Sequence, residues 1–400
     1  MLTTVIIFGI TYIGLSFGGI PGLRLDRAGI ALTGAVACVV AGILSFNEAV
    51  RAIDFNTIIL LLGMMMVASN LRIAGFFAVV SDVIKKHCHN PVLLLAAVIL
   101  SSGILSALYV NDTVCIFFTP FVLELAYALG LNPVPYLIAL VTGSNIGSVA
   151  TITGNPQNML IGIFSGIPYT AFFFELAPVA VVGLLLNFGV VYLIYRNKLT
   201  AGANDSKRII VNRVVHKPLL YKTLLITAGM LIFFFLGYNI SLVAITAAGV
   251  LLITRRVKPG KVYQYINWNM LMMFSGLFVV IHAVEKSGLS QQFFVYTNNF
   301  NLSSVPVFAA VTAILSNLVS NVPAVVLFKS MIPNFADPQK MWLLLAMAST
   351  FAGNLTIIGS VANLIVIEQA KEHVHISFLE YLKTGVPLTL ATIIAGCLML

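Results

Sequence analysis

Polar residues that could do chemistry interrupt two otherwise apolar stretches of the sequence. YVNDT breaks the stretch of about residues 91–130, and SNLVSNVP breaks the one of about 303–333. The first break contains Asp112, and an ionised carboxylate at membrane depth is costly and usually functional. We expect Asp112 to carry a proton or a cation, with a helix N-cap as its alternative role.

Two further segments combine glycine and asparagine, one of them with proline, inside apolar sequence. They are GSNIGSVATITGNPQN at 143–158 and AGNLTIIGSVAN at 352–363. Glycine allows unusual backbone angles and proline removes a hydrogen-bond donor, so both segments should unwind a helix. The half-helix ends and carbonyls exposed by such a break can coordinate a polar substrate or an ion.

The two tips and the two breaks together predict a substrate site made of hydroxyl, amide and backbone groups. Its expected substrate-binding residues are Asn111, Thr113, Asn145, Thr151, Gly154, Asn158, Ser320, Asn321, Thr356, Gly359 and Asn363. Each could instead have a structural role, since Ser, Thr and Asn commonly join or cap helices. No catalytic cluster accompanies them in the sequence, so we expect no enzyme activity.

The elements that must position these residues are membrane helices. Of the 400 residues, 60% are hydrophobic and 9% are charged, and the mean hydropathy is +1.02. These polar groups are too few to cover a globular surface, and long apolar runs without alternation favour an all-α bundle over a β-barrel. Membrane topology explains the net charge of +9 better than a nucleic-acid partner does.

At roughly 20 residues a span, the sequence predicts ten crossings. They are expected near 2–20, 28–46, 55–72, 133–164, 168–195, 219–237, 240–254, 267–286, 340–370 and 378–400. The two interrupted stretches are predicted to form re-entrant hairpins, because each arm is shorter than a comfortable span. The first segment lacks a basic start and a cleavage site, so we expect it to be retained as a span.

The distribution of basic residues predicts the orientation. Eighteen Lys and Arg residues fall on one side of the ten-span arrangement and three on the other, with Lys329 inside the second hairpin. The positive-inside rule makes the first side cytoplasmic. We therefore expect a multi-pass protein of the cell inner membrane with both termini on the outer side.

The two halves of the sequence resemble each other. The matched pairs are DFNTIILLLGMM with NWNMLMMFSGLF, ILSALYVNDT with ILSNLVSNVP, and TITGNPQNMLI with TIIGSVANLIV. Residues 1–195 and 219–400 are predicted to be inverted repeats of five spans each, joined by a basic cytoplasmic linker at 196–218. Asp112 aligns with Val322, and this broken symmetry indicates a role beyond architecture.

Several other kinds of site are not predicted. The four cysteines lack CxxC spacing, so neither a metal site nor a disulfide framework is expected, and Cys115 is interpreted as a packing residue. The sequence has no Walker motif, so we expect no cofactor and an ion gradient as the energy source. A soluble ATPase docking on the basic loop around Lys207 and Arg208 is the alternative. Lys329 could pair with Asp112, attract an anion or reach the interface.

The same residues resemble the ion transporter superfamily. NDTVCIFFTPFVLEL at Asn111 looks like the Asn-Asp hairpin of the arsenical pump membrane proteins, the ArsB-type arsenite permeases. SNIGSVATITGNPQNMLIG and GNLTIIGSVANLIV resemble the two unwound helices of that family, which is related to NhaD-type antiporters and divalent anion transporters. The resemblance implies an inverted-repeat fold with two re-entrant hairpins, and a homodimer whose transport part moves as an elevator.

The tip sequences also bear on the substrate. Dicarboxylate transporters of the superfamily carry Ser-Asn-Thr at both hairpin tips and Thr-Pro-Pro after the break. This sequence has Asn-Asp-Thr, Ser-Asn-Val and Asn-Pro-Gln at the corresponding places, which argues against a dicarboxylate.

The leading hypothesis is a secondary transporter that expels arsenite, and antimonite with it, in exchange for protons. Arsenous acid is an uncharged trihydroxide at neutral pH, so hydroxyls, amides and carbonyls suit it without a fixed positive charge. Asp112 would be the proton-coupling residue. A sodium/proton antiporter, with Asp112 among the oxygen ligands, and an inorganic-anion permease that uses Lys329 are the alternatives.

Overall fold

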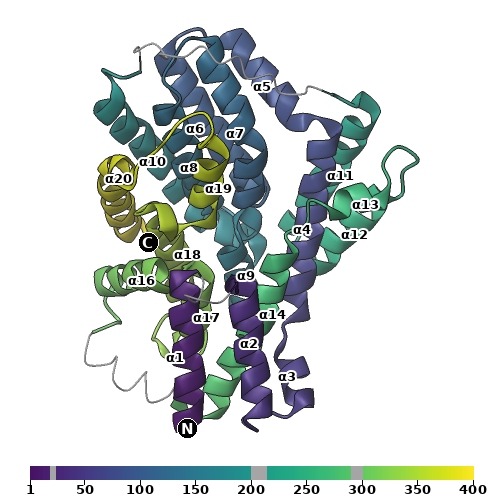
Figure 1. Cartoon of the computed structure of the whole chain (residues 1–400), viewed down its shortest axis with the longest axis vertical. Helices are drawn as coiled ribbons and strands as arrows, with labels where there is room; N and C mark the ends of the chain where they lie inside the picture. The colour runs from purple at the N-terminus through teal and green to yellow at the C-terminus, as the bar shows by residue number, and fades with distance from the viewer. Residues whose placement is uncertain (19–23, 200–213, 290–300) are drawn as a thin grey trace.

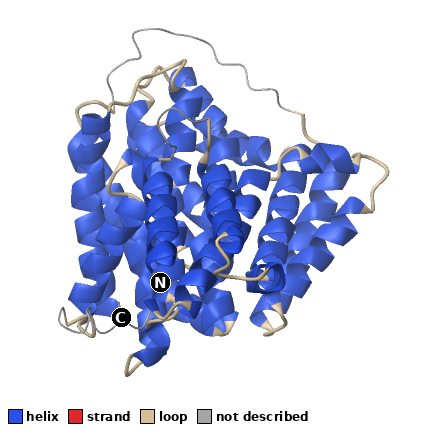
Figure 2. Cartoon of the chain, turned by 60° about the horizontal axis from the view of Figure 1, so that its bottom comes forward, coloured by secondary structure: helices blue, strands red, loops and turns tan. Residues whose placement is uncertain are grey.

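The computed structural model describes residues 1–18, 24–199, 214–289 and 301–400, and within them the regular structure is helical (Figure 2). The all-α prediction is therefore confirmed for this part of the chain. Lys207 and Arg208, the docking place in the alternative with a soluble ATPase, lie outside the described residues, as does most of the predicted linker.

In the first half, the described residues form ten α-helices and one 3-10 helix. They are α1 (Leu2–Phe17), α2 (Arg27–Val40), α3 (Phe46–Ala52), α4 (Phe55–Ala74), α5 (Phe76–His87), α6 (Pro91–Leu108), α7 (Asn111–Ala128), α8 (Val134–Ser148), η1 (Ile152–Gly154), α9 (Pro156–Ser165) and α10 (Tyr169–Tyr195).

In the second half, the described residues form the following helices. They are α11 (Lys217–Phe235), α12 (Ile240–Leu252), α13 (Pro259–Tyr263), α14 (Trp268–Lys286), α16 (Val305–Val319), α17 (Asn321–Phe328), η3 (Ile332–Asn334), α18 (Pro338–Ala352), η4 (Ile357–Gly359), α19 (Val361–Ala370) and α20 (Phe378–Met399). A hairpin, a helix interrupted by a 3-10 turn and a long final helix thus occur in the same order in both halves. Their inverted relation and the domain boundaries stay predictions.

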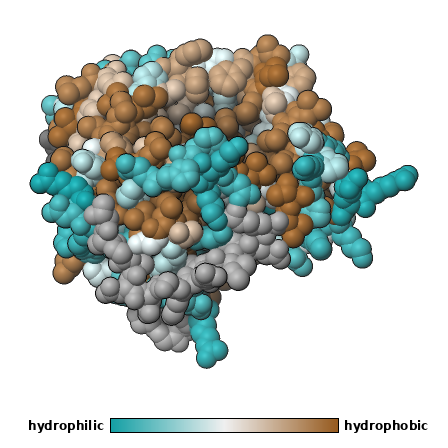
Figure 3. Space-filling view, turned by 90° about the horizontal axis from the view of Figure 1, so that it is seen from above, coloured by the Kyte–Doolittle hydropathy of each residue, from teal (hydrophilic) through white to brown (hydrophobic). Residues whose placement is uncertain are grey.

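The helix lengths fit a multi-pass membrane protein. Six described helices are long and apolar enough to cross a membrane, namely α4, α6, α10, α11, α14 and α20, and five more are apolar but shorter. Side chains such as Leu225 and Leu398 are 75% and 83% exposed, and Figure 3 shows hydrophobic residues over much of one face. Exposed apolar side chains on spanning helices are typical of contact with lipid.

One expectation about the hairpins is wrong. The prediction is two short helical arms in each interrupted stretch. In the first stretch, however, α6 has 18 residues and is long and apolar enough to cross a membrane. Only Tyr109 and Val110 separate α6 from α7, so the polar residues occupy the helix ends and shorten neither arm. In the second stretch the arms are short as expected, with 15 residues in α16 and 8 in α17.

Two pairs of helices pack closely through glycine residues, and the helices lie in two groups. A Cβ atom on Gly63 would lie 2.8 Å from the backbone of Ala244, and one on Gly276 would lie 2.5 Å from the backbone of Ala31. These glycines let α4 approach α12 and let α14 approach α2. In Figure 1, α4, α11 and α12 lie on one side, while α6, α7, α8, α10, α19 and α20 cluster on the other.

Candidate functional site

The first break is held open by two asparagines. Asn155 is the N-cap of α9, and its side chain accepts a hydrogen bond from the amide of Asn158 at 2.8 Å. Asn158 in turn donates to the carbonyls of Ser148 at 3.1 Å and Thr151 at 3.0 Å. These carbonyls have lost helical partners, so Asn158 satisfies groups that would be costly to bury unpaired. Gly154 is required by close approach, because a Cβ atom there would lie 2.1 Å from the Ser148 carbonyl oxygen.

The second break uses the same device. Asn363 donates to the carbonyls of Gly353 at 2.7 Å and Thr356 at 2.8 Å. The Thr356 hydroxyl donates to Asn317 Oδ1 at 3.1 Å, and a Cβ atom on Gly359 would lie 2.8 Å from that oxygen. Thr151 and Thr356 both have extended backbones, with φ of −137° and −133°, immediately before a 3-10 turn. The two threonines and the two asparagines predicted as site residues therefore stabilise the breaks.

Asn145 joins the first hairpin to the second break. Its Oδ1 accepts from Asn111 Nδ2 at 3.0 Å and from the Ser360 hydroxyl at 3.2 Å. Its Nδ2 donates to the Oδ1 atoms of Asn354 at 2.9 Å and Asn363 at 3.0 Å. Asn145 is 1% exposed, so these four bonds lie in the protein interior. Both polar atoms of the Asn145 side-chain amide are thus hydrogen-bonded, and their partners come from both halves of the chain.

The second hairpin tip contacts both breaks through Asn321. With its amide oriented to satisfy the hydrogen-bond network, Asn321 donates to the carbonyls of Ser349 at 3.2 Å and Gly359 at 3.3 Å and accepts from Gln157 Nε2 at 3.3 Å. Ser320 precedes it with φ of 77°, in the left-handed half of backbone space that favours glycine. The tip is therefore a strained turn locked to both interrupted helices.

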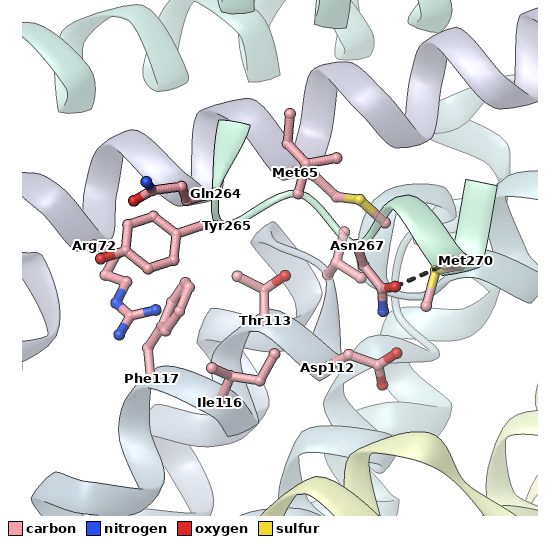
Figure 4. A pocket seen from close by; sticks show the side chains of 12 residues that line it. Met65, Arg72, Asp112, Thr113, Ile116, Phe117, Gln264, Tyr265, Asn267 and Met270 are labelled. Atoms are coloured by element: carbon pink, nitrogen blue, oxygen red, sulfur yellow. Dashed lines mark hydrogen bonds between the residues drawn. The ribbon is translucent and has the colours of Figure 1, made fainter. Parts of the chain in front are cut away.

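Asp112 lies on the wall of a cavity of about 280 Å³. Its side chain is 7% exposed, and within the described chain it has no hydrogen bond and no ion pair. The cavity lies between α4, the start of α7 and the segment from 264 to 270. Figure 4 shows Asp112 at one end of this cavity, Arg72 at the other and Thr113 between them. The buried carboxylate therefore borders a space that can hold a small polar ligand or several waters.

The predicted site residues fall into two sets. Asp112 and Thr113 line the cavity, whereas the other residues build the hydrogen-bonded tips and breaks behind it. Sequence reasoning missed four polar lining residues: Arg72, Gln264, Tyr265 and Asn267. Only Asn267 could be identified from the sequence. It begins NWNMLMMFSGLF, which matches DFNTIILLLGMM, and in both segments the first residue caps the helix with its side chain.

The structure shows the surroundings of Lys329 and Cys115. The Lys329 ammonium lies 4.8 Å from the centroid of the Phe164 ring, and the described residues include no ion pair between Lys329 and Asp112. Cys115 is fully buried. Among the residues described, no group of three or more His, Cys, Asp or Glu side chains could hold a metal ion.

Comparisons with known proteins agree with a transporter. The sequence profile of the citrate transporter (CitMHS) family matches residues 6–352. The chain is similar to the silicon efflux transporter LSI3 of Oryza sativa, with 29% identity over 97% of this chain and 95% of the relative. It is also similar to the putative transporter arsB of Dictyostelium discoideum, at 26% identity over 94% of this chain and 87% of that protein. The solved structure of Neisseria gonorrhoeae MtrF, from a class of antimetabolite efflux pumps, has the same fold, with a TM-score of 0.63, 13% identity, and coverage of 99% of this chain and 93% of that one.

Proposed function

Because the chain belongs to the citrate transporter (CitMHS) family and is a membrane secondary transporter, we propose that it exports arsenite, and antimonite with it, in exchange for protons. One observation carries the proposal. Asp112 is a buried carboxylate that no described group pairs, and it faces a cavity. An ionised carboxylate there is costly, so binding a proton and binding a polar substrate are competing ways to stabilise it.

Neutral hydrogen-bonding groups behind Asp112 suit an uncharged acid. The buried atoms Asn111 Oδ1, Asn158 Oδ1 and Asn354 Nδ2 have no hydrogen-bond partner among the residues that the structure describes. Unpaired buried polar atoms are rare in proteins and often await a ligand or water. Arsenous acid has hydroxyl groups that both donate and accept, so it can pair with amide oxygens and amide nitrogens alike.

In this mechanism the proton and the substrate alternate at one site. On the cytoplasmic side, the neutral Asp112 releases its proton into the cytoplasm, and the hydroxyls of arsenous acid bind to the carboxylate that is left. On the outer side, a new proton neutralises Asp112 and releases the acid. The carboxylate then returns in its neutral form, which is the cheaper form to move through an apolar interior.

The cavity fits a citrate anion less well. Citrate carries several negative charges, which a protein site normally matches with several cationic groups or a metal. Arg72 is the one cationic residue among those that line the cavity, and Asp112 adds a negative charge. Membership in the family therefore supports the fold and the transport mode, while the site favours a neutral acid.

Silicic acid is the second candidate substrate, because a relative of 29% identity is named a silicon efflux transporter. Silicic acid is also a neutral polyhydroxide at neutral pH, so the same amide and hydroxyl groups would bind it. We also propose an inner-membrane homodimer with both termini outside. These features follow from the basic-residue distribution and the resemblance to the superfamily.

The test is transport into everted membrane vesicles that contain the protein. Arsenite should accumulate when the vesicle interior is acidic, and a protonophore should abolish the accumulation. Arms with sodium in place of the proton gradient, and with silicic acid as competitor, separate the alternatives. A sodium-dependent pH change without arsenite movement would overturn the proposal in favour of a cation antiporter.

The Asp112→Asn variant tests the coupling residue. It keeps the size and the hydrogen-bonding capacity of the side chain but cannot ionise, so arsenite movement should become independent of the pH gradient. Asp337→Asn is the matched control, since Asp337 caps α18 at an exposed position and asparagine also caps helices well. Proton-driven accumulation in Asp112→Asn equal to that of the control would remove Asp112 from the mechanism.

A further inference from the structure

Arg72 packs against two aromatic rings at the exposed end of the cavity. Its guanidinium carbon lies 4.3 Å from the centroid of the Phe117 ring and 4.0 Å from that of Tyr265. Phe117 belongs to α7, while Tyr265 lies between α13 and α14. The two rings are 6.0 Å apart and lie at 83° to each other, so they contact the guanidinium from two adjacent sides and restrict its position. Its N–H donors on the remaining sides are left to bind a ligand.

The edge of Arg72 has no partner within the described chain. No hydrogen bond and no ion pair involves its side chain there, although the residue is more than a third exposed. An arginine at the end of a membrane helix usually pairs with an acidic group or a carbonyl. The carboxylate of this cavity, Asp112, lies at the opposite end in Figure 4.

The neighbouring side chains offer further donors. Asn267 Oδ1 already accepts from the amide of Met270 at 3.0 Å, so its Nδ2 group is the part that remains for a ligand. Gln264 adds an amide and Thr113 a hydroxyl to the same wall. A fixed guanidinium surrounded by amide and hydroxyl donors is the arrangement that recognises an oxyanion.

We propose that the edge of Arg72 is a binding subsite for an oxyanion of the carboxylate or phosphate type. The guanidinium would donate two parallel N–H bonds to two oxygens of the anion, and Asn267 or Gln264 would donate a third. The subsite is separate from the neutral-acid site at Asp112 and does not depend on which acid the protein transports. The oxyanion could come from a soluble acid or from a lipid headgroup, since both present the same oxygens.

A second cavity gives the ligand another approach. It has a volume of about 270 Å³ and shares Arg72, Ile116 and Phe117 with the first. Arg72 therefore stands between the two cavities. An anion bound to its edge would place a negative charge at the entrance that leads to Asp112.

Trp268 provides a direct assay. It follows the lining residue Asn267 and is 47% exposed, whereas the second of the two tryptophans, Trp342, is buried. In a Trp342→Phe background, the fluorescence of Trp268 should change saturably with sodium phosphate or acetate and not with sodium chloride at equal ionic strength. Arg72→Gln should raise the half-saturating concentration at least tenfold. Arg72→Lys should raise it as well, because lysine keeps the charge but loses the planar fork.

Lys198→Gln is the matched control. Lys198 is also a cation near an aromatic ring, 5.8 Å from the centroid of Tyr195, but it lines neither cavity. Its loss should leave the half-saturating concentration unchanged. Equal phosphate and acetate binding in Arg72→Gln and in the Trp342→Phe parent would overturn the proposal, as would a response to chloride as strong as that to the oxyanions.

Two lipid compositions distinguish the sources of the oxyanion. In nanodiscs of phosphatidylglycerol, a bound headgroup would raise the half-saturating concentration of phosphate relative to phosphatidylcholine, and Arg72→Gln would remove that difference. Equal values in both lipids would assign the subsite to a soluble anion. Because the assay measures binding, it stands apart from the arsenite transport experiment, and each can fail without the other.

Discussion

Replacing Asn145 by alanine should cost far more than the atoms it deletes. Four hydrogen bonds end on this side chain, and three partner atoms depend on it alone: Asn111 Nδ2, Asn354 Oδ1 and Asn363 Oδ1. The Ser360 hydroxyl keeps a bond from the amide of Ala362. Leaving a buried polar atom unpaired costs about 1 to 3 kcal/mol, so the three atoms together cost about 3 to 9 kcal/mol of stability.

Water entering the space left by the amide would satisfy part of this loss, so we expect the lower end, about 3 kcal/mol. The measurement is the melting temperature of the purified protein in detergent, which should fall by about 4 °C for a chain of this length. Arsenite transport should also be lost, because the first hairpin tip is no longer joined to the second break.

Asn187→Ala is the control that isolates the mechanism. Asn187 is as deeply buried as Asn145, and the change deletes the same atoms. The Asn187 Oδ1 accepts from the Thr142 hydroxyl, but that hydroxyl also lies 2.7 Å from the carbonyl of Ile138. The Asn187 Nδ2 has no partner within the described chain even before the change. The control therefore leaves no atom newly unpaired. Equal melting temperatures for the two variants would refute the argument from unpaired polar atoms.

Three further predictions concern packing, strain and charge. Gly276→Ala should lower the melting temperature, because its Cβ would clash with the α2 backbone, whereas Gly249→Ala, with nothing within 4 Å, should not. Ser320→Gly should raise the melting temperature by relieving about 1 to 3 kcal/mol of backbone strain. An unchanged melting temperature would show that the backbone of Ser320 is not strained. Lys286 lowers the pKa of Glu48 to about 2, so the stabilisation by this ion pair is complete above the unfolded pKa of about 4.3 and is lost as pH falls through about 2. The melting temperature of Glu48→Gln should accordingly change less between these two pH values than that of the unaltered protein. An equal dependence of the two melting temperatures on pH would contradict this prediction.

Local composition was enough to predict the helix breaks. Glycine and asparagine inside an apolar run have few stable helical arrangements, so Asn158 and Asn363 could be identified from the sequence as residues of the breaks. The structure adds what each amide does, which is to pair with the carbonyls that the break releases. Whether they also bind substrate stays a prediction.

The contacts between distant segments could not be predicted in the same way. Asn145 bonds to Asn354, 209 residues further along the chain, and no periodicity or motif reports such a pair. Arg72 is one of the eighteen basic residues that predict the orientation. The positive-inside rule considers only the charge of a residue and not the contacts of its side chain. Its contacts with Phe117 and Tyr265 depend on three segments that only the folded chain brings together.

The hydrogen bonds also constrain how the protein can alternate between its two open states. The first tip reaches the second break through Asn145, and the second tip bonds to Gln157 at the start of α9. Moving either hairpin alone would break these buried bonds and leave their atoms unpaired. Moving both hairpins and both interrupted helices together would keep these bonds. It would change their contacts with neighbouring helices such as α1, α4 and α14, and the contact of Arg72 on α4 with Phe117 on α7. The arrangement therefore favours a transport part that moves as one body past the paired helices, as the resemblance to the superfamily implies.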